Sequence, residues 1–388
     1  MEYKKIGDII ELHRGYDLPV EQMKIGNIPV VGSNGIVGYH NQERSISPTV
    51  TIGRSGSIGK VHFYEGFTWV HNTALYVNDF KNNNPLYIYY VLKNLNFENL
   101  KSSSVVPSLN RNYIYPLKVP FYINTVDQKK IAQTLLVIDQ KIALNTRMNA
   151  ELEAMAKQLY DYWFVQFDFP DKNGKPYKSS GGKMVWDDKL KRVIPEGWEV
   201  KTLEKIENII VTGKTPSTSD DKNFNGDIPF ITIDDIRNNL YINTTSRTLS
   251  FKGAELQRNK YIPENTLCCS CIGTPGIIGF TSKLSQTNQQ INSIIFKNEK
   301  NREFIFFSLK MIFSLSTAKT GNILPNMNKN EFSNIILVYP SSEILSIFHE
   351  IVSPLFDKIK NNCSETCRLT HLRDSLLPML MNGQVIIE

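Results

Sequence analysis

Gly213, Lys214 and Thr215 come nearest to a chemical motif in this 388-residue chain. A P-loop ends in Gly-Lys-Ser/Thr because its backbone amides and its lysine bind phosphate groups, but it also needs a glycine five positions before its last one. Asn208 occupies that position. The sequence therefore does not predict a nucleotide-binding loop here.

Two further segments match parts of enzyme sites without completing them. In Asn84-Pro85-Leu86-Tyr87, a leucine replaces the second proline of the Asn-Pro-Pro-Tyr loop with which amino-methyltransferases hold a base amine. The GRSGSIG segment has glycine at every third place, so it contains neither GxGxxG nor a GxSxG nucleophile elbow. The six histidines are scattered and form no HExxH pair. We expect no catalytic residues in this chain.

The five cysteines all lie in the second half of the chain, at positions 268, 269, 271, 363 and 367. An odd number without an export signal indicates reduced thiols rather than a disulfide framework. Zinc is the alternative, but Cys268 and Cys269 would lie on opposite faces of a strand and no second CxxC or HxxxH is present. We therefore expect no metal site. The chain also lacks an apolar run of roughly 20 residues, so we expect a cytoplasmic protein.

Composition and charge fit two globular domains with a polyanionic partner. Hydrophobic residues make up 41% of the chain and charged residues 21%, and the net charge is +6. Residues 171–192 carry seven Lys or Arg against three Asp and are rich in Gly and Ser, which is typical of a linker. We attribute the charge of this linker to solvation, with a DNA contact as the alternative.

The sequence contains an internal repeat, and the segments that recur are expected to form the elements that position a functional site. GRSGSIG at residues 53–59 is answered by GTPGIIG at residues 273–279, an offset of 220 positions that also relates Asn72 to Asn292. VPSLNRN at 106–112 returns as LPNMNKN at 324–330, an offset of 218, and Ile-Pro-Val at 28–30 returns as Ile-Pro-Phe at 228–230, an offset of 200. The second copy thus has roughly 20 extra residues, which we expect in loops.

The repeat includes two long helices. Residues 126–164 contain no Pro or Gly, and their apolar side chains follow an a/d heptad pattern that recurs 217 positions later. Asn145 and Asn362 interrupt both patterns at the same place, so we predict an antiparallel helix pair in which they face each other. Two unrelated amphipathic helices are the alternative. The predicted seam residues are Leu135, Ile138, Ile142, Asn145, Leu152 and Leu159 in the first helix and Val352, Leu355, Ile359, Asn362, Leu369 and Leu376 in the second.

Outside these helices each copy has short β-branched and aromatic segments, at residues 48–52, 61–64 and 73–77 in the first. A short helix is expected at 85–95, with its counterpart at 302–313. The predicted fold class is α+β: two similar, strand-rich mixed α/β heads joined by the two antiparallel helices in a pseudo-two-fold arrangement. Two such heads on a rigid spacer would recognise two short DNA sequences separated by a gap of about one helical turn.

The order of these segments resembles that of a specificity subunit of type I restriction-modification systems. The segments concerned are IPVVGSNGIVG at 28–38, GRSGSIGKVHF at 53–63, VPSL at 106–109, DQKKI at 127–131, the junction at 168–200, and LRDSLLP at 372–378 with Gly383. They span essentially the whole chain. The second copy departs from the pattern, because Glu350 lies near where Gln128 should recur and Pro354 falls inside the second helix, which predicts a later start or a bend there.

The resemblance implies a non-catalytic subunit that reads double-stranded DNA. Target-recognition domains would occupy residues 1–125 and 198–340, with a spacer helix at 126–165, a linker at 166–197, and a second spacer helix and tail at 341–388. The helices would dock two methylation subunits, which use S-adenosylmethionine, and restriction/translocase subunits, which use ATP and Mg, would join them. A stand-alone nuclease or methyltransferase, or a protein-binding scaffold, are the rival hypotheses.

Exposed loop residues with donors and acceptors are the candidates for DNA contacts. In the first head these are Arg14, His40, Arg54, Ser55, Lys60, Ser102, Ser103, Asn110 and Arg111. In the second they are Lys214, Thr215, Arg237, Thr274, Lys319, Thr320 and Asn322. Residues that are identical in both copies are poor candidates, because two heads that read different sequences must differ where they read. We therefore expect Asn72 and Asn292 to make a hydrogen bond that supports the fold, with a shared phosphate contact as the alternative.

Overall fold

The computed structural model describes residues 1–97, 100, 108–320 and 326–387. The chain forms two compact units: unit 1 combines Met1–Ile142 with Leu369–Glu388, and unit 2 is Ala143–Arg368. Each unit therefore contains one segment of each long helix. None of the helices in the described ranges has both the length and the apolar character that crossing a membrane requires.

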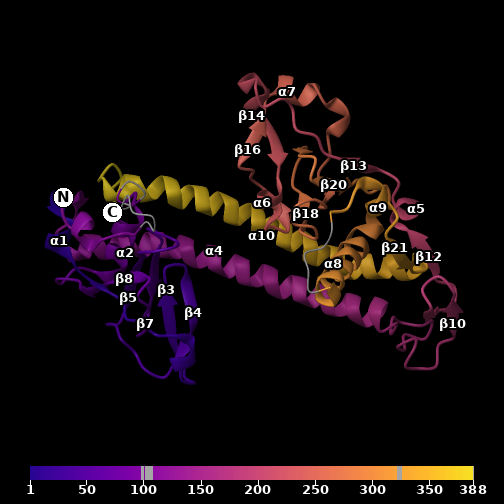
Figure 1. Ribbon diagram of the computed structural model, residues 1–388, viewed down its shortest axis with the longest axis horizontal. Coiled ribbons are helices and arrows are strands. Elements are labelled where there is room, and N and C mark those ends of the chain that lie inside the picture. The colour runs from indigo at the N-terminus through magenta and orange to yellow at the C-terminus, as the bar shows by residue number, and fades with distance from the viewer. Residues whose placement is uncertain (98–99, 101–107, 321–325, 388) are drawn as a thin grey trace. The chain divides into compact units, whose positions relative to one another are not determined.

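Unit 1 is built from three small sheets (Figure 1). Its four-stranded sheet has the order β2 (Glu11–Arg14), β8 (Ala74–Asp79), β5 (Thr49–Gly53), β6 (Val61–Tyr64). A three-stranded sheet has the order β4 (Gly35–His40), β3 (Ile28–Gly32), β7 (Trp69–Val70), and β1 (Glu2–Lys5) pairs with β9 (Lys118–Phe121). All five residues of β5 are buried, as expected for a β-branched central strand.

Short helices cover the core of unit 1. They are α1 (Ile6–Ile9), η1 (Val20–Gln22), α2 (Pro85–Lys93) and α3 (Arg111–Ile114). Helix α2 has Pro85 in its first turn, and the Asn84 side chain accepts a hydrogen bond from the Tyr87 amide, which caps the helix. The core also includes Leu135 and Leu380 from the two long helices.

The five-stranded sheet of unit 2 has the order β13 (Ile210–Thr212), β20 (Ile291–Ile294), β17 (Leu267–Ser270), β18 (Ile278–Thr281), β15 (Tyr241–Ile242). A three-stranded sheet has the order β16 (Arg247–Leu249), β14 (Phe224–Ile231), β19 (Gln286–Thr287), and β12 (Glu199–Thr202) pairs with β21 (Ile336–Tyr339). The predicted linker contains a hairpin of β10 (Met184–Asp187) and β11 (Arg192–Pro195).

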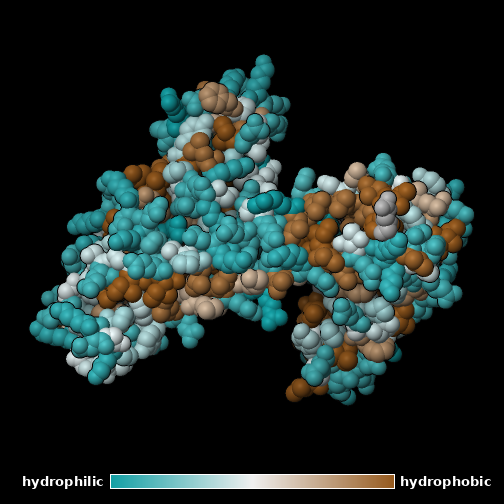
Figure 2. Space-filling view, turned by 180° about the vertical axis from the view of Figure 1, so that it is seen from behind, coloured by the Kyte–Doolittle hydropathy of each residue, from teal (hydrophilic) through white to brown (hydrophobic). Residues whose placement is uncertain are grey.

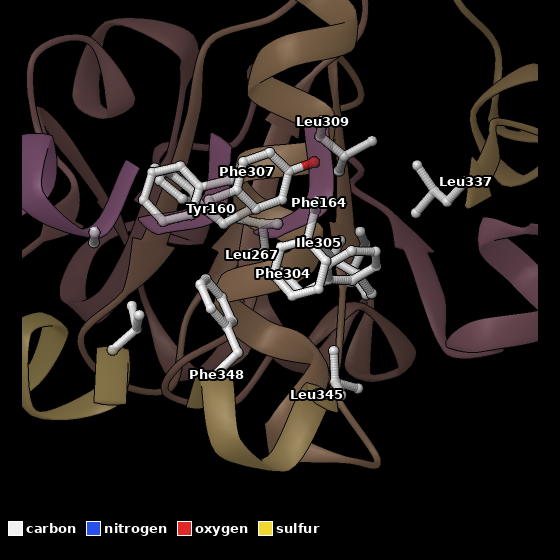
Figure 3. Packing of buried hydrophobic residues seen from close by; sticks show 14 of the residues in the cluster. Tyr160, Phe164, Leu267, Phe304, Ile305, Phe307, Leu309, Leu337, Leu345 and Phe348 are labelled. Atoms are coloured by element: carbon white, nitrogen blue, oxygen red, sulfur yellow. The ribbon is translucent and has the colours of Figure 1, made fainter. Parts of the chain in front are cut away.

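An aromatic cluster forms the core of unit 2. The helices of this unit include α5 (Leu203–Ile206), η4 (Asp221–Asn223), α6 (Ile233–Ile236), α7 (Phe251–Glu255), η5 (Arg258–Lys260), η6 (Glu299–Asn301), α8 (Arg302–Thr320) and α9 (Lys329–Ser333). Figure 3 shows Tyr160, Phe164, Phe304, Phe307 and Phe348 packed together. The rings of Phe164 and Phe348 lie 4.8 Å apart in an edge-to-face contact. Side chains from three helices therefore meet in one cluster.

The two long helices are α4 (Thr125–Tyr160), which continues into a π-helical turn η3 (Asp161–Val165), and α10 (Ser342–Met381). Of the two alternatives that Pro354 predicts, a later start of the second helix is wrong, because α10 begins at Ser342, 12 positions before this proline, and the bend stays a prediction. Leu345, Phe348 and Val352 are buried in the aromatic cluster. Their burial stabilises the first turns by more than the roughly 3 kcal/mol that an internal proline costs.

Both units show the predicted antiparallel pairing of the long helices. In unit 1, Arg373 Nη1 of α10 lies 2.8 Å from Asp139 Oδ1 of α4, and the Tyr90 hydroxyl of α2 donates to Asp139 Oδ2 at 2.8 Å. Arg373 lies 217 positions after Ala156, at an apolar position of the heptad pattern, so a polar network takes the place of an apolar contact there. It fixes α4, α10 and α2 to one another within unit 1.

The polar residues of unit 2 correct the predicted register by four positions. Asn145 does not face Asn362; its Nδ2 lies 2.8 Å from Glu365 Oε2 and 3.4 Å from Thr366 Oγ1. Asn362 instead donates to Asn149 Oδ1 at 2.9 Å. Asn145 and Asn362 are repeat equivalents, as are Asn149 and Thr366, so each helix offers the same two positions to the other. The pairing is still symmetric, but Asn145 lies opposite Thr366 and Asn362 lies opposite Asn149, rather than Asn145 opposite Asn362.

Candidate nucleic-acid interface

Four connecting segments of unit 1 meet where strands β2, β3, β5 and β7 end. We call them loop edge 1: residues 14–17, 33–35, 54–60 and 71–73. The Gly15 and Arg54 amides donate to the carbonyls of Ala74 and Thr73 at 3.0 and 2.8 Å. The Ser33 amide donates to Thr73 Oγ1 at 3.3 Å. These bonds gather segments that are far apart in the sequence.

Gly15 makes this gathering possible. A Cβ on Gly15 would collide with the backbone carbonyl oxygens of His71 and Val70. Gly213 is in the same situation in unit 2, where a Cβ would collide with the carbonyl oxygen of Asn288. Only glycine permits this close backbone approach, so both positions need it.

Loop edge 1 carries polar side chains that are held in place by one another. Asn72 Nδ2 donates to Asp17 Oδ1 at 2.7 Å, and Lys60 Nζ donates to Asn34 Oδ1 at 2.7 Å. Partial burial and the nearby charge of Arg14 lower the pKa of Arg54. Among the residues that the structure describes, no carboxylate forms an ion pair with either arginine. Two neighbouring guanidinium groups without a carboxylate partner suit a phosphate.

Unit 2 has the corresponding loop edge 2, which comprises residues 212–215, 232–239, 271–277 and 288–290. The Lys214 amide donates to the Thr287 carbonyl at 3.0 Å, and the Cys271 amide donates to the Gln290 carbonyl at 2.8 Å. Thr215 Oγ1 donates to Gln289 Oε1 at 2.6 Å. The Lys214 side chain is exposed beside this pair.

Backbone hydrogen bonds fix how the two edges correspond. The Gly53 amide donates to the Lys60 carbonyl and the Gly59 amide to the Gly53 carbonyl; in unit 2, the Ser270 amide donates to Ile277 and the Gly276 amide to Ser270. The glycine loops are therefore related by an offset of 217 positions, not 220. Positive φ angles agree, since Gly56 and Gly59 have +77° and +79° and their counterparts Gly273 and Gly276 have +85° and +95°.

This correction changes which residue of the second copy is equivalent to Asn72. At an offset of 217 its equivalent is Gln289, and the predicted equivalence with Asn292 is wrong. Asn292 lies within β20, is 3% exposed, and accepts a hydrogen bond from Thr212 Oγ1 at 2.7 Å, which supports the sheet. Asn72 and Gln289 both lie on their loop edges instead.

Comparison with known proteins assigns this chain with two similar units to a family. A family model of the type I restriction modification DNA specificity domain matches residues 1–154 and 195–366, one stretch in each copy of the repeat. The chain belongs to this family. It is therefore a DNA-specificity subunit rather than a catalytic one.

Curated relatives and a solved structure agree with this assignment. The chain is 36% identical over 308 residues to the type I restriction enzyme HindI specificity subunit of Haemophilus influenzae, covering 66% of this chain and 67% of that one. It is 27% identical over 325 residues to the MjaIX specificity subunit of Methanocaldococcus jannaschii, covering 78% and 69%. The S subunit crystal structure from M. genitalium has the same fold, with a TM-score of 0.62, 17% identity, and coverage of 98% and 96%.

Half of the candidate DNA-contact residues of this specificity subunit lie on the loop edges. On loop edge 1 these are Arg14, Arg54, Ser55 and Lys60, and on loop edge 2 they are Lys214, Thr215, Arg237 and Thr274. Their side chains are exposed or half-buried. Their contact with DNA stays a prediction.

Three other candidates make contacts within unit 1; we withdraw His40, which is buried, whereas the DNA contacts of the exposed Asn110 and Arg111 stay a prediction. His40 is 4% exposed, accepts a hydrogen bond from the Lys24 amide at 2.9 Å and packs edge-on against Trp69. Asn110 caps α3, as its repeat equivalent Asn328 caps α9. Arg111 Nη1 donates to the Leu12 carbonyl at 2.8 Å.

The remaining candidates fall beyond what the structure describes. Ser102, Ser103 and Asn322 lie outside the described residues. Lys319 and Thr320 form the end of α8, but their side chains are not described.

The sequence prediction did not identify Asp17–Asn72 and Thr215–Gln289 as hydrogen-bonded pairs. The offset of 217 that relates the two long helices was the signal that could have found them, because it aligns Asn72 with Gln289 when it is applied to the loops. The offset of 220, taken from the glycines, obscured this match.

Proposed function

We propose that this specificity subunit reads a split DNA site, with each unit reading one part through its loop edge. The observation that carries the proposal is that two backbones with the same hydrogen bonds present different side chains at the same edge. Shared backbone supplies a common docking frame, and different side chains supply different base preferences. The reading residues belong to 1–125 and 198–340.

The long helices are proposed to set the gap between the two parts of the site and to dock the partner subunits. Apolar side chains of α4 remain exposed at Val126, Val137, Leu144 and Met155, with exposures between 51% and 64%. Figure 2 shows apolar patches, in brown, among the mostly hydrophilic residues of one face. Exposed apolar surface of this kind is typical of protein interfaces.

We assign the chemistry of the complex to those partners. Two methylation subunits would bring S-adenosylmethionine, and restriction/translocase subunits would bring ATP and Mg. The family assignment of this chain as a specificity domain supports the division of labour.

DNA binding by the full-length chain with its methylation subunit is expected to weaken steeply as salt rises. Each phosphate neutralised by a lysine or arginine releases counterions, so contact with about six phosphates should lower the affinity roughly 1,000-fold between about 50 and 200 mM salt. Fluorescence anisotropy with a labelled duplex measures this dependence. Arg14→Ala should reduce the slope of log affinity against log salt by about one.

Arg147→Ala is the matched control for Arg14→Ala. Arg147 is an exposed arginine of α4 that pairs with Glu151 four positions on and belongs to neither loop edge. Its removal should leave the salt slope unchanged. An affinity of the parent complex that does not change with salt would contradict DNA recognition by this chain.

A further inference from the structure

One polar contact occurs at the same place in both loop edges but is made by different residues. The Gly15 and His71 amides donate to the carbonyls of Ala74 and Val31, and the Gly213 and Asn288 amides donate to those of Ile291 and Ile231. These matching bonds make position 17 equivalent to 215, and position 72 equivalent to 289. The Asp17–Asn72 contact is therefore the counterpart of the Thr215–Gln289 contact.

The geometry of each contact decides which groups of the amide remain free. An ionised Asp17 can only accept, so Asn72 must direct Nδ2 toward it, which leaves Oδ1 and one N–H for another partner. Thr215 donates to Gln289 Oε1, which leaves both N–H groups and one acceptor site of the oxygen. Each amide thus keeps an adjacent donor and acceptor, and Gln289 is exposed.

An adjacent donor and acceptor on one amide match the edge of adenine. Asn and Gln bind adenine through N7, which accepts, and N6, which donates, and adenine is the only single base whose major-groove edge carries both an acceptor and a donor. We propose that Asn72 and Gln289 each read an adenine, one in each part of the split site, and that Asp17 and Thr215 are positioning residues that orient the two amides. This inference rests on the proposed function and names the base at each loop edge.

The neighbours of the two amides differ, so the flanking base pairs should differ too. Arg14 and Arg54 of loop edge 1 correspond to Thr212 and Cys271 of loop edge 2, and Cys271 is buried. Loop edge 1 therefore carries two guanidinium groups in addition to its amide, and these groups suit guanine or a phosphate. Loop edge 2 adds none at these positions.

The second equivalent contact lies deeper. His71 Nδ1 and Thr73 Oγ1 are 3.1 Å apart, and the equivalent Asn288 Nδ2 donates to Gln290 Oε1 at 2.8 Å. Asn288 is only 9% exposed. In unit 2 this contact is therefore internal to the loop, whereas Gln289 is exposed; in unit 1, His71, Asn72 and Thr73 are all half-buried.

Substitution of single adenines by 7-deazaadenine, which lacks the N7 acceptor, tests the inference on the full-length chain with its methylation subunit. The recognised site is first mapped, and each adenine of a duplex carrying it is then replaced in turn. In the parent, one replacement in each part of the site should weaken binding about 5- to 150-fold. With Asn72→Ala one of these two effects should vanish, and with Gln289→Ala the other.

Each variant is the control of the other, because each should leave the second part of the site unaffected. Thr215→Ala should diminish the 7-deazaadenine effect linked to Gln289, and Thr215→Ser, which keeps the hydroxyl, should retain it. A loss of the effect in Thr215→Ala without rescue by serine would overturn the positioning role.

The failure of this inference is distinguishable from the failure of the proposed function. If the parent binds the mapped site with a steep salt dependence but both 7-deazaadenine effects persist in Asn72→Ala and Gln289→Ala, the adenine assignment is wrong and DNA recognition stands. If the parent does not discriminate the mapped site from other duplexes, the proposed function itself is wrong.

Discussion

Exchange of residues 1–125 for the corresponding head of another specificity subunit is expected to change one part of the recognised site and to leave the other part intact. Loop edge 1 lies entirely within this range, and β1 pairs with β9 inside it, so the head carries its own strands. Each base pair of the old half-site that the new head does not recognise should cost about 1–3 kcal/mol. Competition binding with duplexes in which each half is replaced separately measures the two parts independently.

The junction of this exchange needs one precaution. Gln128 of α4 is fully buried, accepts from the Asn84 amide at 2.8 Å, and donates to Asn83 Oδ1 and the Tyr122 carbonyl at 2.9 and 2.7 Å. The head taken from the other specificity subunit should therefore have asparagine at the position equivalent to Asn83. The reciprocal exchange of residues 198–340 is the control and should change only the other half. A simultaneous change of both halves after either exchange would show that the heads do not read independently.

Replacement of Phe348 by alanine is expected to lower the free energy of unfolding of unit 2 by about 3–5 kcal/mol. Phe348 is fully buried and contacts the rings of Trp163 and Phe164 at 5.9 and 4.8 Å, so it joins α10 to the end of α4. Its removal leaves a cavity, and the surrounding aromatic rings are held on three different helices and cannot all move to fill it. Urea denaturation followed by tryptophan fluorescence reports on this cluster through Trp163 and Trp198, and replacement of Trp69 of unit 1 by phenylalanine removes the signal of the other unit's core.

Ile351→Ala is the matched control on the same helix. Ile351 is 46% exposed, so its truncation should change the free energy of unfolding by less than about 1 kcal/mol. Equal effects of the two substitutions would contradict the role of Phe348 in holding the helices together within unit 2.

The long helices were predictable because their pattern is long and repeated. Heptad spacing over residues 126–164 and its recurrence 217 positions later predicted two helices, and α4 and α10 occupy these regions. The start of α10 was not predictable from Pro354 alone. Local backbone preference disfavours a proline there, but tertiary burial of Phe348 and Val352 outweighs it.

The glycines alone could not settle the register of the glycine loops. A Gly-x-x-Gly-x-x-Gly segment superposes on itself after a shift of three positions, so offsets of 217 and 220 both align glycines. Only the hydrogen bonds decide, because the amide of Gly53 and the amide of Ser270 make the same bond. Because the glycines fit both offsets, the sequence did not reveal that Gln289 is the counterpart of Asn72.

The roles of individual polar residues depend on their surroundings rather than on their type. Asn110 caps a helix, Asn292 lies in a sheet and Asn72 lies on a loop edge, although all three are asparagines in loop-rich heads. Likewise, His40 was predicted on a loop but is buried against Trp69. Residue type and spacing therefore do not decide which polar side chains support the fold and which lie on a loop edge.

Base-resolved mapping of methylated positions, in cells that express this chain with its methylation subunits, tests the split-site proposal most directly. Two heads with different loop edges predict a single motif made of two short, different sequences separated by a gap of constant length and unspecified bases. We expect every methylated site to fit that motif. A continuous motif would contradict recognition by two heads on one chain. Methylation of either half-motif whatever its distance from the other half would contradict it too.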